Sequence, residues 1–148
     1  MTRYAKQDAS GCRPKTILVA DDEKHILNLL DGKLRHAGFR VITATNGAKA
    51  FELACAYRPD LVIADFQMPL LSGLELCSKL RCQPQTRQMP AILLTASGFR
   101  FLQSDPETDN IKNVIIKPFT PCEVLTTVLF LVGQSRMEME SANGRGGT

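Results

Sequence analysis

The sequence predicts a doubly wound α/β domain, in which helices cover both faces of one parallel β-sheet. Five short runs along the 148 residues are continuously apolar rather than alternating, as in strands that are buried on both faces. Segments with helical periodicity separate most of these runs, and an alternation of strand and helix is the pattern of α/β folds. The expected strands are Thr16–Ala20, Val41–Ala44, Leu61–Ala64, Ala91–Thr95 and Val114–Ile116.

The two helices expected in the first half of the chain have recognisable ends. The first begins near Asp22 and stops before Gly38, since glycine readily takes the left-handed conformation that follows many helices. The second begins at Asn46, whose side chain is a favourable N-cap. The apolar faces of these helices are expected at Ile26, Leu29, Leu30, Leu34, Ala37, Ala50, Leu53 and Ala54.

Two further helices are expected to begin with a capping box, in which two side chains satisfy backbone N–H groups reciprocally. Ser72 and Glu75 have the required spacing. Thr120 and Glu123 repeat it, with Pro121 at the first helical position. The last helix is expected to bury Val124, Leu125, Val128, Leu129 and Val132.

The stretch 97–113 is the position of a fourth helix in this alternating pattern, but its composition is atypical. Pro106 interrupts a polar sequence, and proline breaks the interior of a helix. We therefore expect a short helix at Phe99–Gln103 and irregular chain after it.

The chain is expected to form one folded domain at residues 15–133, with a polar segment at each end. Residues 1–14 are expected to be a disordered or flexible extension, and residues 134–148 a frayed helix end and flexible tail, because periodicity is lost there. The sequence alone leaves open whether this is a single-domain protein or a piece of a longer one.

Composition and charge favour a cytoplasmic protein and give no support to several other classes. The net charge is +3 and no dense run of lysine and arginine occurs, so nucleic-acid binding is not expected. No segment reaches the roughly 18 apolar residues of a membrane span, and no secretory signal is visible. The five cysteines include no CxxC pair, which favours reduced thiols over a zinc site or a disulfide framework.

Polar side chains end or directly follow four of the expected strands, namely Asp21, Asp22, Asp65, Thr95 and Lys117. The carboxyl ends of parallel strands form the edge of a sheet where ligands bind, so these side chains should converge. Three carboxylates in one place repel each other and one lysine is insufficient to neutralise them, so a divalent cation such as Mg²⁺ is expected. A carboxylate beside that cation could accept a phosphoryl group as a nucleophile.

Five motifs, in order and over residues 15–132, together resemble the receiver domain of bacterial two-component response regulators, in particular single-domain regulators of the chemotaxis kind. The motifs are Ile17–Glu23, Asp60–Pro69, Ser72–Leu76, Leu93–Ala96 and Lys117–Phe119. The resemblance implies a flavodoxin-like receiver fold with a five-stranded parallel sheet in the order 2-1-3-4-5.

The resemblance makes Asp65 the phosphoacceptor. Lys117 would pair with the phosphoryl group or, before that group arrives, with Asp65. Thr95 and the backbone N–H of Ala96 would contact phosphoryl oxygens, and the small side chain of Ala96 would leave the group accessible. The Lys117–Pro118 peptide bond is expected to be cis, which would aim the lysine into the site.

The resemblance also implies the magnesium ligands and two positions that tune the rate. Asp22, Asp65 and the backbone carbonyl of Gln67 would bind Mg²⁺ directly, and Asp21 would hold it mainly through water. Gln67 and Ser97 occupy positions at which the family tunes the rate of dephosphorylation.

Two departures from the family pattern concern how the phosphorylated state is recognised. Receivers commonly carry tyrosine or phenylalanine three residues before the lysine, whereas this sequence has Val114 there. In the family, the aromatic side chain at this position changes rotamer together with the site threonine, and Val114 cannot do this. The fourth helix, normally regular and part of the output face, is polar and interrupted by Pro106.

The function implied by the resemblance is phosphorelay signalling. A histidine kinase or phosphotransfer protein would donate the phosphoryl group, and phosphorylation would switch the binding of an unknown downstream protein target. The domain would catalyse only its own phosphorylation and dephosphorylation, so it is not expected to be an enzyme with an external substrate. Formation of a homodimer stays open.

Two alternatives also stay open at this point. The first is a receiver-like scaffold that docks partners without being phosphorylated. The departures at Val114 and Pro106 keep it open, although such domains tend to lose site residues and this chain keeps all five. The second is an aspartate-nucleophile phosphohydrolase, which also combines a strand-end aspartate with threonine and lysine. Such enzymes usually need a second aspartate two residues after the nucleophile, where this chain has Gln67.

Overall fold

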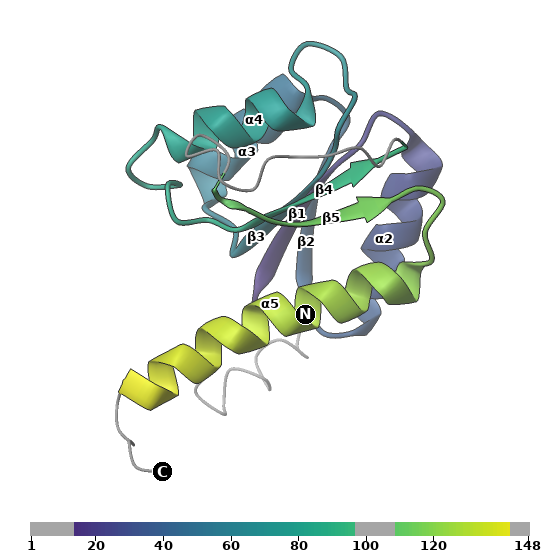
Figure 1. The fold of residues 1–148 in the computed structure, drawn as a ribbon. Helices are drawn as coiled ribbons and strands as arrows, with labels where there is room; N and C mark the ends of the chain where they lie inside the picture. Colours follow the sequence, from purple (N-terminus) through teal and green to yellow (C-terminus); the bar gives the residue numbers. More distant parts are fainter. Residues whose placement is uncertain (1–13, 97–108, 143–148) are drawn as a thin grey trace.

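The computed structural model of the chain describes residues 14–96 and 109–142, with side chains up to residue 133. Within these ranges, five parallel strands form one sheet in the order β2-β1-β3-β4-β5 (Figure 1). The strands are β1 (Thr16–Ala20), β2 (Arg40–Ala44), β3 (Leu61–Asp65), β4 (Ala91–Thr95) and β5 (Ile111–Ile116). The α/β class and the strand order expected from the sequence are confirmed.

Helices cover both faces of this sheet. In the described ranges they are α2 (Lys24–His36), α3 (Gly47–Tyr57), α4 (Gly73–Arg81) and α5 (Pro121–Ala142). α2 and α5 pack on one face, and α3 and α4 lie side by side on the other (Figure 1). Successive side chains of a strand point to opposite faces of the sheet. Ile17 and Val19 of β1 therefore join the core under α2 and α5, whereas Leu18 and Ala20 join the core under α3 and α4.

The buried faces of α2 and α5 differ from the expected ones. Leu27 of α2 is buried, whereas Leu29 is 44% exposed and Ala37 is an exposed C-cap. In α5, Leu129 is 49% exposed, and Leu131 packs against the core instead. A helix turns about 100° per residue, so a leucine two positions away faces the opposite side. Because both faces of each helix carry leucines, apolar periodicity alone did not identify which side chains are buried.

Three expected helix ends are confirmed. Gly38 follows α2 with a φ of 101°, in the left-handed region that glycine tolerates. At the start of α3, the Asn46 side chain accepts a hydrogen bond from the N–H of Lys49. At the start of α4, Ser72 and Glu75 make both hydrogen bonds of a capping box. These caps fix where each helix begins or ends relative to its strand.

α5 extends beyond the expected end of the domain. At its start, the Thr120 hydroxyl accepts a hydrogen bond from the N–H of Glu123, which is one half of the expected capping box. The helix continues to Ala142, so the stretch that the sequence marks as a frayed end is helical up to that residue. The short helix expected at Phe99–Gln103 lies outside the described residues. Because residues 1–13 and 143–148 lie outside the described ranges, the expected boundaries of the folded domain stay predictions.

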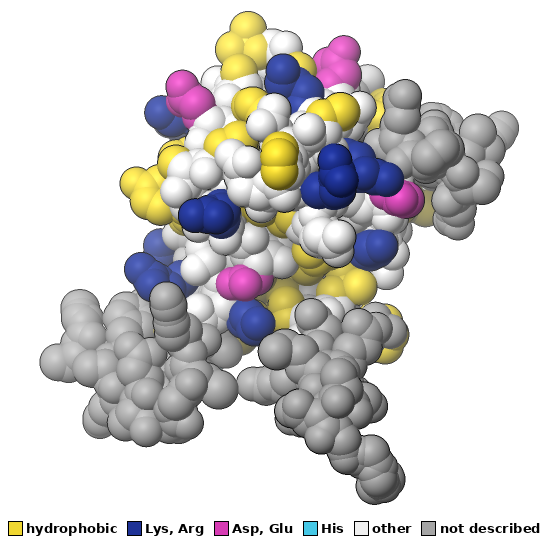
Figure 2. Space-filling view, turned by 90° about the vertical axis from the view of Figure 1, so that its left-hand side faces the viewer, with side chains coloured by type: hydrophobic (Ala, Val, Ile, Leu, Met, Phe, Trp, Pro, Cys, Tyr) yellow, Lys and Arg dark blue, Asp and Glu magenta, His cyan; other side chains and the backbone are white. Residues whose placement is uncertain are grey.

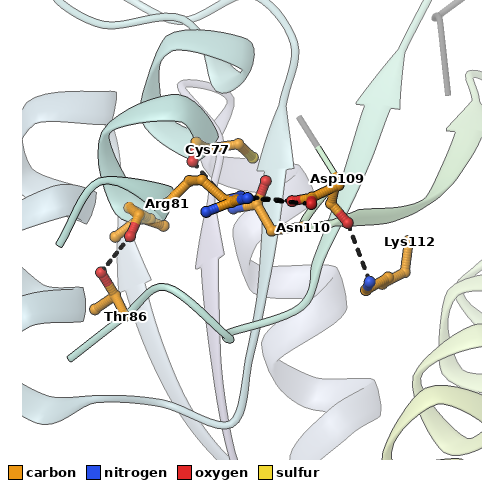
Figure 3. A network of polar contacts seen from close by, with 7 residues as sticks. Cys77, Arg81, Thr86, Asp109, Asn110 and Lys112 are labelled. Atoms are coloured by element: carbon orange, nitrogen blue, oxygen red, sulfur yellow. Dashed lines mark hydrogen bonds and ion pairs between the residues drawn. The ribbon is translucent and has the colours of Figure 1, made fainter. Parts of the chain in front are cut away.

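A polar network ties the start of β5 to α4 (Figure 3). The guanidinium of Arg81 binds both carboxylate oxygens of Asp109, with N–O distances of 2.5 and 3.2 Å. The side-chain N–H of Asn110 donates to the Cys77 carbonyl at 3.0 Å. β5 begins at Ile111, earlier than the apolar run suggested, because an edge strand tolerates exposed polar residues.

Charged side chains are spread over the surface rather than gathered in one patch on the face that Figure 2 shows. Lysine and arginine side chains there are interspersed with hydrophobic and acidic ones. In the described part of the chain, no helix has the length and apolar character needed to cross a bilayer.

Candidate functional site

A pocket of about 400 Å³ opens at the carboxyl edge of the sheet, where β1, β3, β4 and β5 end. Its lining consists of Asp22, Glu23, Asp65, Phe66, Gln67, Thr95, Ala96 and Lys117. The parallel register explains this convergence, since Ala20 pairs with Ala64, Asp65 with Leu94, and Thr95 with Ile116. The residues at the carboxyl ends of these strands therefore lie side by side along one edge of the sheet.

Three carboxylates meet at this edge. Asp21, Asp22 and Asp65 each offer an oxygen, and these oxygens lie within 4.8 Å of one another. Asp21 is fully buried, Asp65 is 7% exposed and Asp22 is exposed. Asp21 Oδ1 accepts a hydrogen bond from the N–H of Glu23 at 2.9 Å. The cluster therefore combines one buried, one nearly buried and one open carboxylate.

Lys117 is the cation of the cluster. Its Nζ lies 3.0 Å from Asp65 Oδ1 and 3.6 Å from Asp21 Oδ2. The backbone N–H of Lys117 donates to the Thr95 carbonyl at 2.7 Å, which continues the β4–β5 pairing past the strand ends. The Lys117–Pro118 peptide bond is cis. The lysine thus reaches across β4 to the aspartates that end or follow β3 and β1.

Burial dominates the electrostatics of the two inner carboxylates. It raises the pKa of Asp21 to about 6, against the hydrogen bond from Glu23. Burial also raises the pKa of Asp65, while the hydrogen bond and charge of Lys117 act in the opposite direction. For Lys117, burial disfavours the ammonium, but the hydrogen bond to Asp65 and the charges of both aspartates outweigh it and raise its pKa. One lysine thus leaves the negative cluster incompletely neutralised.

The donor set of the cluster fits a metal ion. Asp21 Oδ2 is buried and accepts no hydrogen bond, although a buried polar atom normally has a partner. Carboxylate oxygens are the ligands that hard divalent cations prefer. The nearest charged partner of Asp21 Oδ2 is the Lys117 ammonium at 3.6 Å, so a cation beside Asp21, Asp22 and Asp65 would contact this oxygen more closely and neutralise the remaining charge. The acidic triad can therefore hold a metal ion.

The loop between β3 and α4 is closely held against the strands. The N–H of Phe66 donates to the Leu94 carbonyl at 2.7 Å, and the N–H of Gly73 donates to the Phe66 carbonyl at 3.0 Å. A side chain at Gly73 would put its Cβ 2.4 Å from the Asp65 carbonyl oxygen, so this position requires glycine for space. The loop that follows Asp65 therefore returns close to its own starting point.

The residues expected in the site fall into three groups. Gln67, Thr95 and Ala96 line the pocket with the charged residues. Val114 is partly buried and packs in the core under α3 and α4. Ser97 lies outside the described residues.

Two lining residues, Glu23 and Phe66, were not expected to contribute to the pocket. A sequence signal existed for Glu23, since it continues the Asp21-Asp22 pair after the first strand. No comparable signal marked Phe66, because an apolar residue after a strand usually belongs to the core.

Comparison with known proteins agrees with this fold and pocket. The family described as "Response regulator receiver domain" matches residues 17–129. The chain is 35% identical over 128 residues to the alkaline phosphatase synthesis transcriptional regulatory protein PhoP of Bacillus subtilis, covering 86% of this chain and 52% of that protein. It is 34% identical over 126 residues to the phosphate regulon transcriptional regulatory protein PhoB of Rhizobium meliloti, covering 84% of this chain and 55% of that protein. The chain thus spans about half the length of these curated relatives.

Solved structures show the same architecture. The chemotaxis response regulator CheY4 of Vibrio cholerae aligns with a TM-score of 0.69 and 29% identity, covering 78% of this chain and 96% of that one. The receiver domain of the sensor histidine kinase PA1611 of Pseudomonas aeruginosa, described with a magnesium ion in its active-site cleft, aligns with a TM-score of 0.70 and 28% identity, covering 81% and 98%. This chain therefore belongs to the response regulator receiver domains, and its acidic pocket is consistent with signalling through a phosphorylated aspartate.

Proposed function

We propose that this domain is a phosphorylation-controlled binding switch in which Asp65 accepts the phosphoryl group. The observation that carries the proposal is the pairing of Asp65 with Lys117 at 3.0 Å in a pocket that Asp22 also lines, with a carboxylate oxygen of the buried Asp21 close to both aspartates. Burying a carboxylate is unfavourable unless it is paired or coordinates a metal ion, and Asp65 is paired with Lys117. Asp65 is the member of the cluster that is both nearly buried and part of the pocket lining, which favours it as the nucleophile.

In the proposed step, a carboxylate oxygen of Asp65 uses a lone pair to form a bond to phosphorus. The bond between phosphorus and the leaving atom of the donor breaks, and its electron pair stays with the donor, which leaves as imidazole from a phosphohistidine or as acetate from acetyl phosphate. The protein mainly positions the nucleophile and neutralises charge. The Lys117 ammonium would pair with phosphoryl oxygens, and the Thr95 hydroxyl and the Ala96 backbone N–H would donate hydrogen bonds to them.

We propose Mg²⁺ as the cation of the acidic triad. Asp22, Asp65 and the backbone carbonyl of Gln67 would bind it directly, and Asp21 mainly through water. Bound there, the ion would supply positive charge to the carboxylates and to the phosphoryl oxygens. The oxygen donor set, the buried Oδ2 of Asp21 that accepts no hydrogen bond and the magnesium ion described for the P. aeruginosa receiver support this choice.

The phosphoryl donor would be a histidine kinase or a phosphotransfer protein, and the output would be altered affinity for another protein. That protein must bind one state more tightly than the other for a signal to pass. Gln67 and Ser97 would tune how long the phosphoryl group stays. With Val114 at the position of the usual aromatic residue, recognition of the phosphorylated state would not use an aromatic rotamer there.

The direct test is incubation with acetyl phosphate and Mg²⁺, followed by intact and peptide mass spectrometry. One phosphoryl adduct on Asp65 is expected, and it should be absent from D65N and from samples with EDTA. D60N is a matched control just before the same strand, where Asp60 accepts a hydrogen bond from the N–H of Thr16 and lies outside the pocket. That variant should be phosphorylated like the wild type.

Two other outcomes would decide against the switch. A folded wild-type protein that binds Mg²⁺ but stays unmodified with acetyl phosphate and with phosphorylated histidine kinases would favour a scaffold role. Steady turnover of p-nitrophenyl phosphate would instead favour a phosphohydrolase.

A further inference from the structure

We infer that Gly47, which lies outside the pocket lining, is a positioning residue for the loop that carries the site's backbone ligand. The inference rests on the proposed function, because the ligand in question is the Gln67 carbonyl. Gly47 is the first residue of α3, whereas Gln67 lies in the loop 66–72 between β3 and α4. Two elements that are distant in the sequence therefore meet beside the site.

The contact between Gly47 and this loop is made by backbone atoms. A Cβ on Gly47 would lie 2.0 Å from the Leu71 carbonyl oxygen, 2.8 Å from its carbon and 2.6 Å from Leu71 Cβ. Such separations are far below any real Cβ contact. Because the obstacle is main chain, no change of side-chain rotamer can relieve it.

Position 47 requires glycine because there is no space for a side chain, not because the backbone conformation demands it. Gly47 is absent from the positions with positive φ, and it begins a regular helix behind the Asn46 N-cap. An alanine would suit that backbone at least as well, since glycine is a weaker helix former. The missing side chain instead admits the Leu71 carbonyl.

Neither side of the contact can move away freely. α3 is fixed by the Asn46 cap and by Ala50 and Ala54, which are fully buried against the sheet. On the other side, the N–H of Leu71 donates to the Pro69 carbonyl at 2.7 Å, and the next residue opens the capping box of α4. Because Leu71 is tied to Pro69 on one side and to the capped start of α4 on the other, a displacement at Leu71 is expected to move the loop that carries Gln67.

The expected consequence of a methyl group at position 47 is a shift of the loop by about 1 Å. A misplacement of that size is enough to weaken ligation or catalysis severely. Gly47 thus sets the distance between α3 and the loop, and through it the position of the Gln67 carbonyl relative to Asp65.

The test compares G47A with G32A. Gly32 lies in α2, and a Cβ at that position would meet no other atom within 4 Å, so alanine there should fit without strain. Both variants are titrated with Mg²⁺ by calorimetry at a temperature where circular dichroism shows them to be folded. Phosphorylation by acetyl phosphate is then measured across Mg²⁺ concentrations. G47A should raise the Kd for Mg²⁺ roughly tenfold or more, as loss of a supporting contact does in other metal sites.

The readouts separate a positioning role from a structural one. If G47A lowers Tm but the folded protein binds Mg²⁺ with the wild-type Kd, the inference is wrong. A half-saturating Mg²⁺ concentration that rises in G47A but not in G32A supports it. If the wild type itself is never phosphorylated although G47A weakens Mg²⁺ binding, the proposed function fails and the positioning role stands.

A measurement on the wild-type chain keeps the inference testable if G47A does not fold. During an NMR titration with Mg²⁺, the amide resonances of Gly47 and Ala48 should shift together with those of the loop 66–72. Resonances of Gly38, which follows the C-terminal end of α2, should stay in place. Loop resonances that shift while Gly47 does not would overturn the inference.

Discussion

The ammonium of Lys117 lies 3.0 Å from Oδ1 of Asp65, and the two residues come from the ends of strands that are not neighbours in the sheet. β4 separates β3 from β5, so the lysine must cross the end of β4 to reach the carboxylate. The backbone hydrogen bond from Lys117 to Thr95 holds it at that crossing. This ion pair is the central electrostatic contact of the site.

Removing the lysine charge should impair phosphorylation without unfolding the protein. In K117Q the initial rate with acetyl phosphate is expected to fall by about 10² or more, as when other groups that stabilise developing charge are removed. The pKa of Asp65 should also rise further, since the hydrogen bond and charge of Lys117 lower it. Carbon-13 NMR of the carboxyl groups would measure the second effect.

K112Q provides the matched control for this charge change. Lys112 lies on β5, the strand that Lys117 follows, and donates to the Asp109 carbonyl at 3.0 Å, away from the pocket. Equal phosphorylation rates in K117Q and the wild type would contradict the role given to Lys117.

The metal-free protein should lose stability as pH rises across the range in which Asp21 titrates. Burial raises the pKa of Asp21 from 3.8 to about 6, so the folded state binds that proton more tightly than the unfolded state does. The contribution of Asp21 to the free energy of unfolding is then greatest below pH 3.8 and is lost as pH rises through about 6. The loss would be at most about 3 kcal/mol, from the size of this pKa shift.

Urea unfolding in EDTA at a series of pH values would check this dependence, with D21N for comparison. D21N has no carboxyl at the buried position, so its stability should vary less between pH 4 and about 6.5. If wild type and D21N show the same pH dependence, Asp21 does not have the raised pKa.

Two leucines on α2 should respond very differently to truncation. L27A removes a buried side chain of the core and is expected to lower the free energy of unfolding by about 2–5 kcal/mol. L29A removes a side chain that is 44% exposed and should change it by about 0.5 kcal/mol or less. Chemical denaturation of both variants would test which face of the helix is buried, and comparable losses would show that the buried face is assigned incorrectly.

The ion pair between Arg81 and Asp109 should contribute to stability at neutral pH and lose that contribution in acid. The hydrogen bond from Arg81 holds the pKa of Asp109 below its usual value, so the carboxylate is favoured in the folded state. R81Q should therefore have a lower Tm than the wild type at pH 7, and the gap should close as pH falls through the lowered pKa of Asp109. R87Q, which changes an exposed arginine in the segment between α4 and β4, should show no such gap.

Much of the fold follows from local signals. β1 and β4 have the expected bounds, and both are short continuous apolar runs of the length typical of buried strands. Caps at Asn46 and Ser72 were recognisable since their hydrogen bonds join residues three positions apart. The buried faces of α2 and α5 could not be recognised from the sequence. In α2, for example, whether Leu27 or Leu29 is buried depends on where the sheet lies.

The sequence by itself determined which residue types stand at the strand ends, and hence that carboxylates, a threonine and a lysine would meet at one edge. The tertiary structure decided how they meet. It buried Asp21 fully, set Lys117 within reach of two aspartates, and brought Gly47 against the Leu71 carbonyl. Such contacts join residues far apart in the chain, so their distances follow from packing around the sheet, which no local pattern encodes.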